Sequence, residues 1–270
     1  MTEPAAPRRS HRRRRSHPRR LPRKHGPAAW VRLAAIAIQF LTRLPVRVRY
    51  FEGGLRRAVG FFPAVGAIVA AIGIGVRWAL GGVIGEGPAT VLAVAAMVVS
   101  TGALHEDGLA DAADGLWGGA TPEDRLRIMR DSRLGTYGTI ALILLFAAKL
   151  VVLWPMDLGT FAAALVPAMV LGRASSLVLM RRLPPVSDSL AALAGAPTAA
   201  GWIVAGATCI VALVGFGRWA AVPLALSLAI TAGAEALARR KIGGLTGDVL
   251  GATNQLVELG VLLSAAAVLG

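Results

Sequence analysis

The sequence contains a single cysteine and few charged residues. Cys209 stands alone among 270 residues, which excludes an intramolecular disulfide and a metal cluster held by cysteines. Charged residues make up only 16% of the chain, whereas soluble domains average about 25%. The mean hydropathy is +0.62. These values exclude an ordinary soluble domain and indicate a chain that is largely embedded in a membrane.

Long apolar runs recur along the chain, each near the roughly 20 residues that an α-helix needs to cross a bilayer. The first apolar stretch, residues 28–46, carries Arg32, Gln39 and Arg43, so it fits better in the membrane interface than across it. The sequence predicts an all-α fold, a polytopic integral membrane helical bundle with about six to seven transmembrane helices plus an N-terminal interfacial helix. The predicted spans are 59–85, 88–104, 137–156, 159–180, 201–217, 219–238 and 250–269.

The net charge of +14 is concentrated at the N-terminus, where residues 1–25 hold ten lysines and arginines and one acid. Residues 1–27 have no apolar periodicity, which predicts a disordered basic cytoplasmic tail, and residues 28–270 form the membrane-embedded catalytic domain. The tail could determine topology, bind acidic membrane lipid or contact nucleic acid, and lipid binding is the favoured function. The tail has no aromatic side chain to stack on a base, so no specific nucleic-acid partner is predicted.

Basic residues also occupy alternate connections between the spans. Residues 43–57, 105–134, 181–199 and 239–249 carry five, four, two and three of them, whereas the intervening connections are very short and carry only Arg218. This asymmetry predicts that the charged connections face the cytoplasm. The acidic stretch 105–138, which holds seven of the 15 acids, then meets cytoplasmic substrates.

Three aspartates in this stretch are spaced as on one face of a helix. Asp107, Asp111 and Asp114 fall at i, i+4 and i+7, within an arc of about 60°. Carboxylates placed so closely repel one another unless a cation or basic partners lie between them, and hard oxygen ligands suit Mg²⁺. The sequence predicts a Mg²⁺ site. The alternative is a solvated loop with capping aspartates, in which the turn-like Asp114-Gly115 ends the helix.

Other charged residues have two interpretations each. Asp131 is a further ligand, a general base, or a partner of the flanking Arg130 and Arg133. His105 is a general base or an interfacial residue at the end of a span. Lys149 and Arg173, inside apolar runs, bind substrate phosphate or pair with buried acids such as Glu235 or Glu258.

Two further features bear on the site. Residues 243–248 form a glycine-rich bend before the last span, where the amide of Gly247 could hold phosphate and Asp248 could join the metal site. A short helix is predicted at 122–130, with Thr121 as its N-cap and Pro122 at its first position.

Several motifs together resemble one enzyme family, the cobalamin synthases, which are adenosylcobinamide-GDP ribazoletransferases. The motifs are Phe40-Leu41-Thr42-Arg43-Leu44-Pro45-Val46, His105-Glu106-Asp107-Gly108-Leu109-Ala110-Asp111-Ala112-Ala113-Asp114-Gly115, Ile128-Met129-Arg130-Asp131-Ser132-Arg133-Leu134-Gly135-Thr136-Tyr137-Gly138 and Gly243-Gly244-Leu245-Thr246-Gly247-Asp248, with Lys149, Arg173 and Glu258. They cover nearly the whole chain apart from the basic tail. Two positions depart from the family pattern: Glu106 stands where a hydrophobic residue is common, and Gln255 stands where a glutamate is often found.

The resemblance implies a reaction late in cobalamin biosynthesis. Adenosylcobinamide-GDP and α-ribazole, or its 5′-phosphate, would give adenosylcobalamin, or its 5′-phosphate, and GMP. It also implies a Mg²⁺-dependent, multi-pass enzyme of the bacterial cytoplasmic (inner) membrane. Asp107, Asp111, Asp114 and Asp248 would hold the metal, Asp131 or His105 would take the hydroxyl proton, and Arg130, Arg133, Lys149, Arg173 and Gly247 would bind phosphate.

Other functional classes fit less well. A CDP-alcohol phosphotransferase shares the Asp111-x-x-Asp114-Gly115 start of its motif, but the rest of that motif is absent. A membrane prenyltransferase would need a second dense aspartate cluster. A transporter would place charge near the midplane of broken helices, often in two related halves, whereas most charge here lies at one predicted face. The sequence leaves open whether the chain forms an oligomer.

Overall fold

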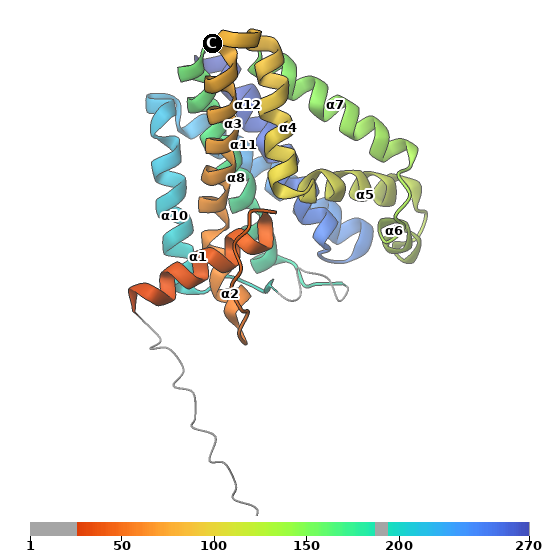
Figure 1. The fold of residues 1–270 in the computed structure, drawn as a ribbon. Helices are drawn as coiled ribbons and strands as arrows, with labels where there is room; N and C mark the ends of the chain where they lie inside the picture. The colour runs from red at the N-terminus through yellow and green to blue at the C-terminus, as the bar shows by residue number, and fades with distance from the viewer. Residues whose placement is uncertain (1–25, 187–193, 270) are drawn as a thin grey trace, which may run out of the picture.

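The computed structural model describes residues 26–186 and 194–269, and within them every regular element is a helix. The tail predicted for residues 1–27 lies, up to His25, outside the described residues. The helices are α1 Pro27–Leu41, α2 Gly54–Ala58, the 3₁₀ helix η1 Val59–Phe61, α3 Phe62–Ile84, α4 Glu86–Thr101, α5 Leu104–Gly118, α6 Pro122–Met129, α7 Thr136–Leu153, α8 Leu158–Arg182, α10 Ala199–Leu213, the 3₁₀ helix η2 Val214–Trp219, α11 Ala221–Ile242 and α12 Gly247–Leu269 (Figure 1).

Six continuous helical stretches are long and apolar enough to cross a membrane, or seven crossings result if α4 and α5 count as one bent span. The six are Gly54–Ile84, Thr136–Leu153, Leu158–Arg182, Ala199–Trp219, Ala221–Ile242 and Gly247–Leu269. Six of the predicted spans coincide with these helices, whereas the predicted span 88–104 falls on α4, which counts as a crossing only together with α5. The predicted all-α bundle is confirmed. The predicted interfacial helix is α1, which is shorter than expected because the chain is extended after Leu41.

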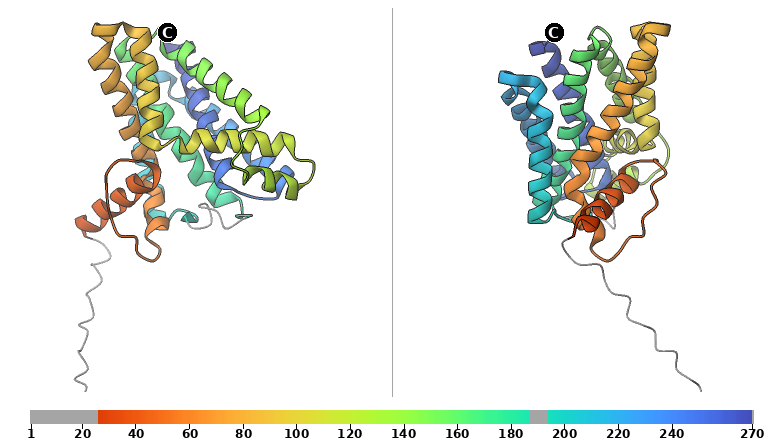
Figure 2. Two further views of the ribbon diagram at one scale, coloured as in Figure 1. Left: turned by 45° about the vertical axis from the view of Figure 1, so that its right-hand side comes forward. Right: turned by 60° about the vertical axis from the view of Figure 1, so that its left-hand side comes forward.

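The helices meet around two central members, α8 and α12 (Figure 2). α12 packs against α8, α5 and α11, while α3 packs against α4 and α8. Small residues permit close approach. A Cβ added to Gly60 in η1 would overlap the backbone of Gly201 in α10, and a Cβ on Gly66 in α3 would overlap the backbone of Met169 in α8. Close backbone contact is how helices associate in lipid, where no hydrophobic force drives them together.

A sharp corner separates α4 from α5. Gly102 and Ala103 both have left-handed backbone conformations, with φ of 65° and 57°, and α5 leaves α4 at 85°. A left-handed φ is unusual for alanine, so the surrounding packing holds Ala103 in this conformation. α5 consequently runs sideways from the end of α4, across the direction of the long helices rather than along it (Figure 2). There it packs on α12, where a Cβ at Gly108 would lie 3.1 Å from the Cα of Gly251.

Arg77 joins four helices at the opposite end of the bundle. Its side chain is 1% exposed and stacks over the ring of Phe161 in α8. The guanidinium donates to the Glu86 carboxylate and the Thr90 hydroxyl of α4. It also donates to the carbonyls of Leu153, Trp154 and Met156, where α7 ends. One buried cation thus satisfies the orphan carbonyls of a helix end.

Candidate active site

α5 carries the three aspartates at the predicted helical spacing. The helix runs without interruption from Leu104 to Gly118, so Asp107, Asp111 and Asp114 share one helix. The alternative in which Asp114 ends the helix is therefore wrong. The predicted short helix is also present as α6, and the Thr121 hydroxyl accepts the backbone N–H of Asp124 as the expected N-cap.

A cavity of about 200 Å³ lies where α1, α3, α5, α8 and α12 meet. It is lined by His105, Asp107, Arg173, Gly247 and Asp248, which come from three helices distant in the sequence. These are five of the predicted site residues. Gly247 begins α12, so the amide end of that helix borders the cavity together with the Arg173 guanidinium. Positive partial charge at a helix N-terminus and a nearby arginine suit an anionic ligand.

Asp111 lies one helical turn beyond Asp107, within the electrostatic influence of the neighbouring carboxylates. Burial raises the pKa of Asp111 to about 7, and the charges of Asp107, Asp248 and Asp114 act in the same direction. Neither Asp107 nor Asp111 has a side-chain hydrogen bond or ion pair within the described residues. No three Asp, Glu, His or Cys side chains of the described chain approach one another closely enough to hold a metal ion. The site therefore offers free carboxylates without a closed ligand cage.

Asp114 makes different contacts from the other two aspartates. One carboxylate oxygen accepts the backbone N–H of Gly135 at 2.8 Å, and the other accepts that of Gly138 at 2.9 Å. These amides lie at the start of α7, whose N-cap residue Gly135 has no side chain to satisfy them. A carboxylate in this position also interacts favourably with the helix dipole. Asp114 thus ties α5 to α7.

The predicted base Asp131 lies in the loop between α6 and α7. Arg133 grips its carboxylate through both the Nε and Nη2 groups, at 2.6–3.1 Å. These hydrogen bonds lower the pKa of Asp131 to about 2. Arg130 and Arg133 are both exposed, and none of the three lines the cavity. Of the alternatives for Asp131, the structure contains the salt bridge, and its partner is Arg133.

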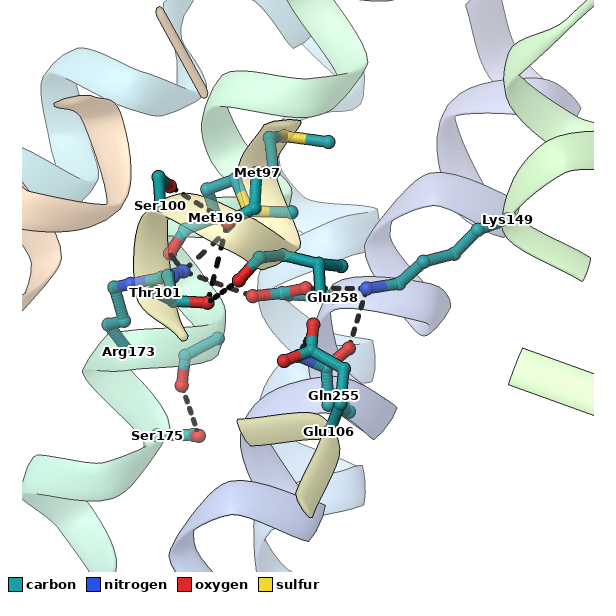
Figure 3. Close-up of polar contacts among 12 residues, drawn as sticks. Met97, Ser100, Thr101, Glu106, Lys149, Met169, Arg173, Ser175, Gln255 and Glu258 are labelled. Atoms are coloured by element: carbon teal, nitrogen blue, oxygen red, sulfur yellow. Dashed lines mark hydrogen bonds and ion pairs between the residues drawn. The ribbon is translucent and has the colours of Figure 1, made fainter. Parts of the chain in front are cut away.

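Lys149 and Arg173 both pair with Glu258 (Figure 3). Lys149 Nζ lies 2.8 Å from Glu258 Oε2, and Arg173 Nη1 lies 3.0 Å from Glu258 Oε1. All three side chains are buried. The pairing with Glu258 that the sequence left open is thus found for both cations, whereas Glu235 pairs with Arg182 and Arg239. Arg173 also lines the main cavity, but Lys149 does not.

The two departures from the family pattern contact each other in this network (Figure 3). Gln255 Nε2 donates to Glu106 Oε1 at 3.1 Å, and Lys149 Nζ donates to Gln255 Oε1 at 2.6 Å. Glu106 therefore places a carboxylate beside the position where Gln255 lacks one. Sequence reasoning did not assign a role to either residue. The available signal was the spacing of Gln255 and Glu258, which puts both on one face of α12.

A second, much smaller cavity of about 20 Å³ lies inside the network and shares His105 and Arg173 with the first. Its lining includes Glu106 and Arg173, whose Oε2 and Nε atoms are buried without a hydrogen-bond partner in the described structure. A polar cavity of this size has room for one water molecule. Such a water would satisfy atoms that are costly to leave unpaired.

His105 lies between the two cavities and is neutral. Burial, and then the positive charges of Arg173 and Lys149, hold its pKa well below the ordinary value. The imidazole side chain makes no hydrogen bond to any described residue. One ring nitrogen of a neutral imidazole accepts a hydrogen bond and the other donates one. His105 can therefore receive a proton from a ligand in the main cavity.

The bundle defines a multi-pass membrane protein, in which several carboxylates, an arginine and a helix N-terminus border one cavity. The family model described as cobalamin-5-phosphate synthase matches residues 33–266. The chain therefore belongs to the cobalamin-5-phosphate synthase family.

Curated relatives agree. The chain is 44% identical to the adenosylcobinamide-GDP ribazoletransferase of Sinorhizobium medicae over 247 residues, which cover 84% of this chain and 93% of the relative. It is 40% identical to the proteins of the same name from Rhizobium meliloti and Ralstonia nicotianae, over 84% of this chain and 93% and 92% of theirs. No solved structure matches the chain.

Proposed function

We propose that this protein joins adenosylcobinamide-GDP to α-ribazole, or its 5′-phosphate, and releases GMP. Membership of the cobalamin-5-phosphate synthase family and the shared name of its relatives support this reaction. The structural observation that carries it is the meeting of Asp107, Asp248, Arg173 and His105 around one cavity. A pyrophosphate needs cationic groups around it and a base for the incoming hydroxyl, and this cavity supplies both.

The chemical step replaces the phosphoanhydride bond of the pyrophosphate with a phosphate ester bond. The ribose hydroxyl of α-ribazole attacks the phosphorus on the cobinamide side of the pyrophosphate, a new P–O bond forms, and the bond to GMP breaks. Of the two candidate bases, the geometry favours His105, because it lines the cavity and makes no side-chain hydrogen bond within the described residues. Asp131 lies outside the cavity and is held by Arg133. Arg173 and the N-terminus of α12 bind the phosphates.

The residues present fit a Mg²⁺ ion. Mg²⁺ usually takes one or two carboxylates and completes its shell with water and substrate phosphate, so it does not require a closed cage of protein ligands. Asp107 and Asp111 have free carboxylates, and the charges of Asp107 and Asp248 both act on Asp111. One or two of these carboxylates, completed by water and substrate phosphate, would hold the ion. Asp114 already accepts two amide hydrogen bonds, so it would fix the position of α5, which carries Asp107 and Asp111, rather than bind the ion. A bound Mg²⁺ would neutralise the pyrophosphate and stabilise the leaving phosphate.

The site is proposed to face the cytoplasm from the bacterial inner membrane. The basic connections 43–57, 105–134 and 239–249 are predicted to lie on the cytoplasmic side. The same positive charge would draw this face toward acidic lipid headgroups.

The test is GMP release by the purified full-length protein in lipid, given adenosylcobinamide-GDP and α-ribazole, with and without Mg²⁺. We expect GMP and a cobalamin product in equal amounts, and loss of both when the metal is chelated and their return when Mg²⁺ is added. A folded, metal-loaded protein that releases no GMP would contradict the reaction. Turnover that persists unchanged after chelation would contradict the metal alone.

A further inference from the structure

The main cavity has an apolar wall that the phosphate chemistry does not use. Phe40 at the end of α1 and Phe62 at the start of α3 stack with their ring planes 10° apart and their centroids 5.6 Å apart. Both rings line the same cavity as the charged residues Asp107, Arg173 and Asp248. The remaining apolar members of the wall are Leu41, Leu104, Met180 and Leu250. The cavity therefore has an aromatic part and an ionic part.

Two polar side chains, His105 and Ser176, contribute to the lining of the cavity. His105 and Ser176 are each 6% exposed, and both line the cavity. Neither side chain makes a hydrogen bond to another described residue. A polar side chain that faces a cavity without a protein partner can bond to water or to a ligand. Their hydrogen-bonding capacity is consistent with a ligand that carries a few polar atoms into an otherwise apolar space.

The volume of the cavity limits which part of the two substrates can fit inside it. Pockets for drug-sized ligands enclose about 300–1,000 Å³, and this one encloses about 200 Å³. A corrin macrocycle with its amide arms is larger than a drug-sized molecule and does not fit. A planar bicyclic base does fit, which leaves guanine and the dimethylbenzimidazole of α-ribazole.

The chemistry of the wall favours the benzimidazole. Guanine carries several donors and acceptors on its edge, and an apolar wall would leave them unpaired. Dimethylbenzimidazole has methyl groups on its edge and one free ring nitrogen, which His105 or Ser176 can meet. Sites discriminate strongly when a buried hydrogen-bonding group loses its partner. An aromatic face also stacks on a base.

We propose that the main cavity is the binding site for the base of α-ribazole, which lies against Phe40 and Phe62. The ribose then points toward His105 and Asp107, and the adenosylcobinamide-GDP pyrophosphate approaches from the Gly247 and Arg173 side. This inference rests on the proposed function. It assigns the cavity to the attacking nucleoside, so the corrin ring must lie outside the cavity.

The decisive variant is Phe40→Leu, measured against Phe61→Leu. Phe40 and Phe61 are both partly buried and pack against the same core, so the two replacements perturb the fold to a similar degree. Phe61 forms the neighbouring aromatic pair with Trp30 of α1, at 5.9 Å between centroids, and does not line the cavity. Both variants thus lose one aromatic contact between α1 and the start of the first span, but only Phe40→Leu changes the proposed base site.

Two readouts follow. Calorimetry with α-ribazole alone gives its dissociation constant, and steady-state turnover gives KM for each substrate. For Phe40→Leu we expect the dissociation constant and the KM of α-ribazole to rise about three- to tenfold, as loss of an aromatic contact predicts. The KM of adenosylcobinamide-GDP should change less than twofold, and Phe61→Leu should leave both KM values within twofold. Free dimethylbenzimidazole should compete with α-ribazole and not with adenosylcobinamide-GDP.

The opposite results overturn the proposal. A rise in the KM of adenosylcobinamide-GDP alone would assign the cavity to the guanine nucleotide. Unchanged constants in Phe40→Leu would exclude the cavity as a base site. The proposed function fails separately, because it requires GMP release by the unaltered protein, whereas binding of α-ribazole is measured without turnover.

Discussion

Replacing Glu258 with glutamine should destabilise the bundle strongly. Glu258 is the acid that both Lys149 and Arg173 contact, at 2.8 and 3.0 Å, and its side chain is 2% exposed. The substitution keeps the shape but leaves two buried cations with only Glu106 nearby. Breaking a buried ion pair by removing one partner costs about 3–5 kcal/mol, because the other charge stays buried and uncompensated.

A second carboxylate offers a matched control. Glu86 also accepts an arginine, Arg77, at 3.0 Å, but its side chain is 58% exposed. Ion pairs that reach solvent contribute about 0–1 kcal/mol, so Glu86→Gln should change stability little. The two variants make the same chemical change, and the two carboxylates differ in burial and in the number of cations that they contact.

The assay is thermal unfolding of the protein in detergent, followed by the reaction of Cys209, the sole cysteine, with a fluorogenic maleimide. With about 2–4 °C per kcal/mol for chains of 150–250 residues, Glu258→Gln should lower Tm by roughly 6–20 °C, and Glu86→Gln by no more than about 4 °C. If the two variants melted within about 2 °C of each other, burial of the network would not be what stabilises this part of the fold.

Three further predictions concern other sites. Asp107→Asn should lower turnover by more than about a hundredfold with membrane insertion intact, while Asp131→Asn should retain most of the turnover, as GMP release would show. Gln255→Glu alone should destabilise the protein, because it sets two carboxylates about 3.1 Å apart, and the exchange Glu106→Gln with Gln255→Glu should restore Tm. Arg77→Met should lower the free energy of unfolding by about 1–3 kcal/mol for each carbonyl left unpaired, without changing the KM of either substrate.

The positions of the helices could be predicted from the sequence because they depend on local properties. Each span follows from the length and hydropathy of one run, and the N-cap of α6 follows from Thr121 and Pro122. The corner before α5 did not follow in the same way. Ala103 adopts its left-handed conformation because of its surroundings, and alanine itself gives no signal for it.

The site was predictable to the extent that its residues share one end of the bundle. Asp107, Arg173 and Asp248 do line one cavity. The partners of individual residues were not predictable, because they come from elements far apart in the chain. Asp114 accepts hydrogen bonds from the backbone amides of Gly135 and Gly138, and no pattern of side chains in the sequence predicts these contacts.

The packing of α5 on α12 has a consequence for how the protein is made. The carboxylates of α5 are synthesised well before α12, to which Asp248 and the helix end that borders the cavity belong. Gly108 can meet Gly251 only after α12 has inserted beside α8. Until then α5 lacks the helix on which it packs. A chain in which α12 is not yet in place therefore lacks a complete cavity.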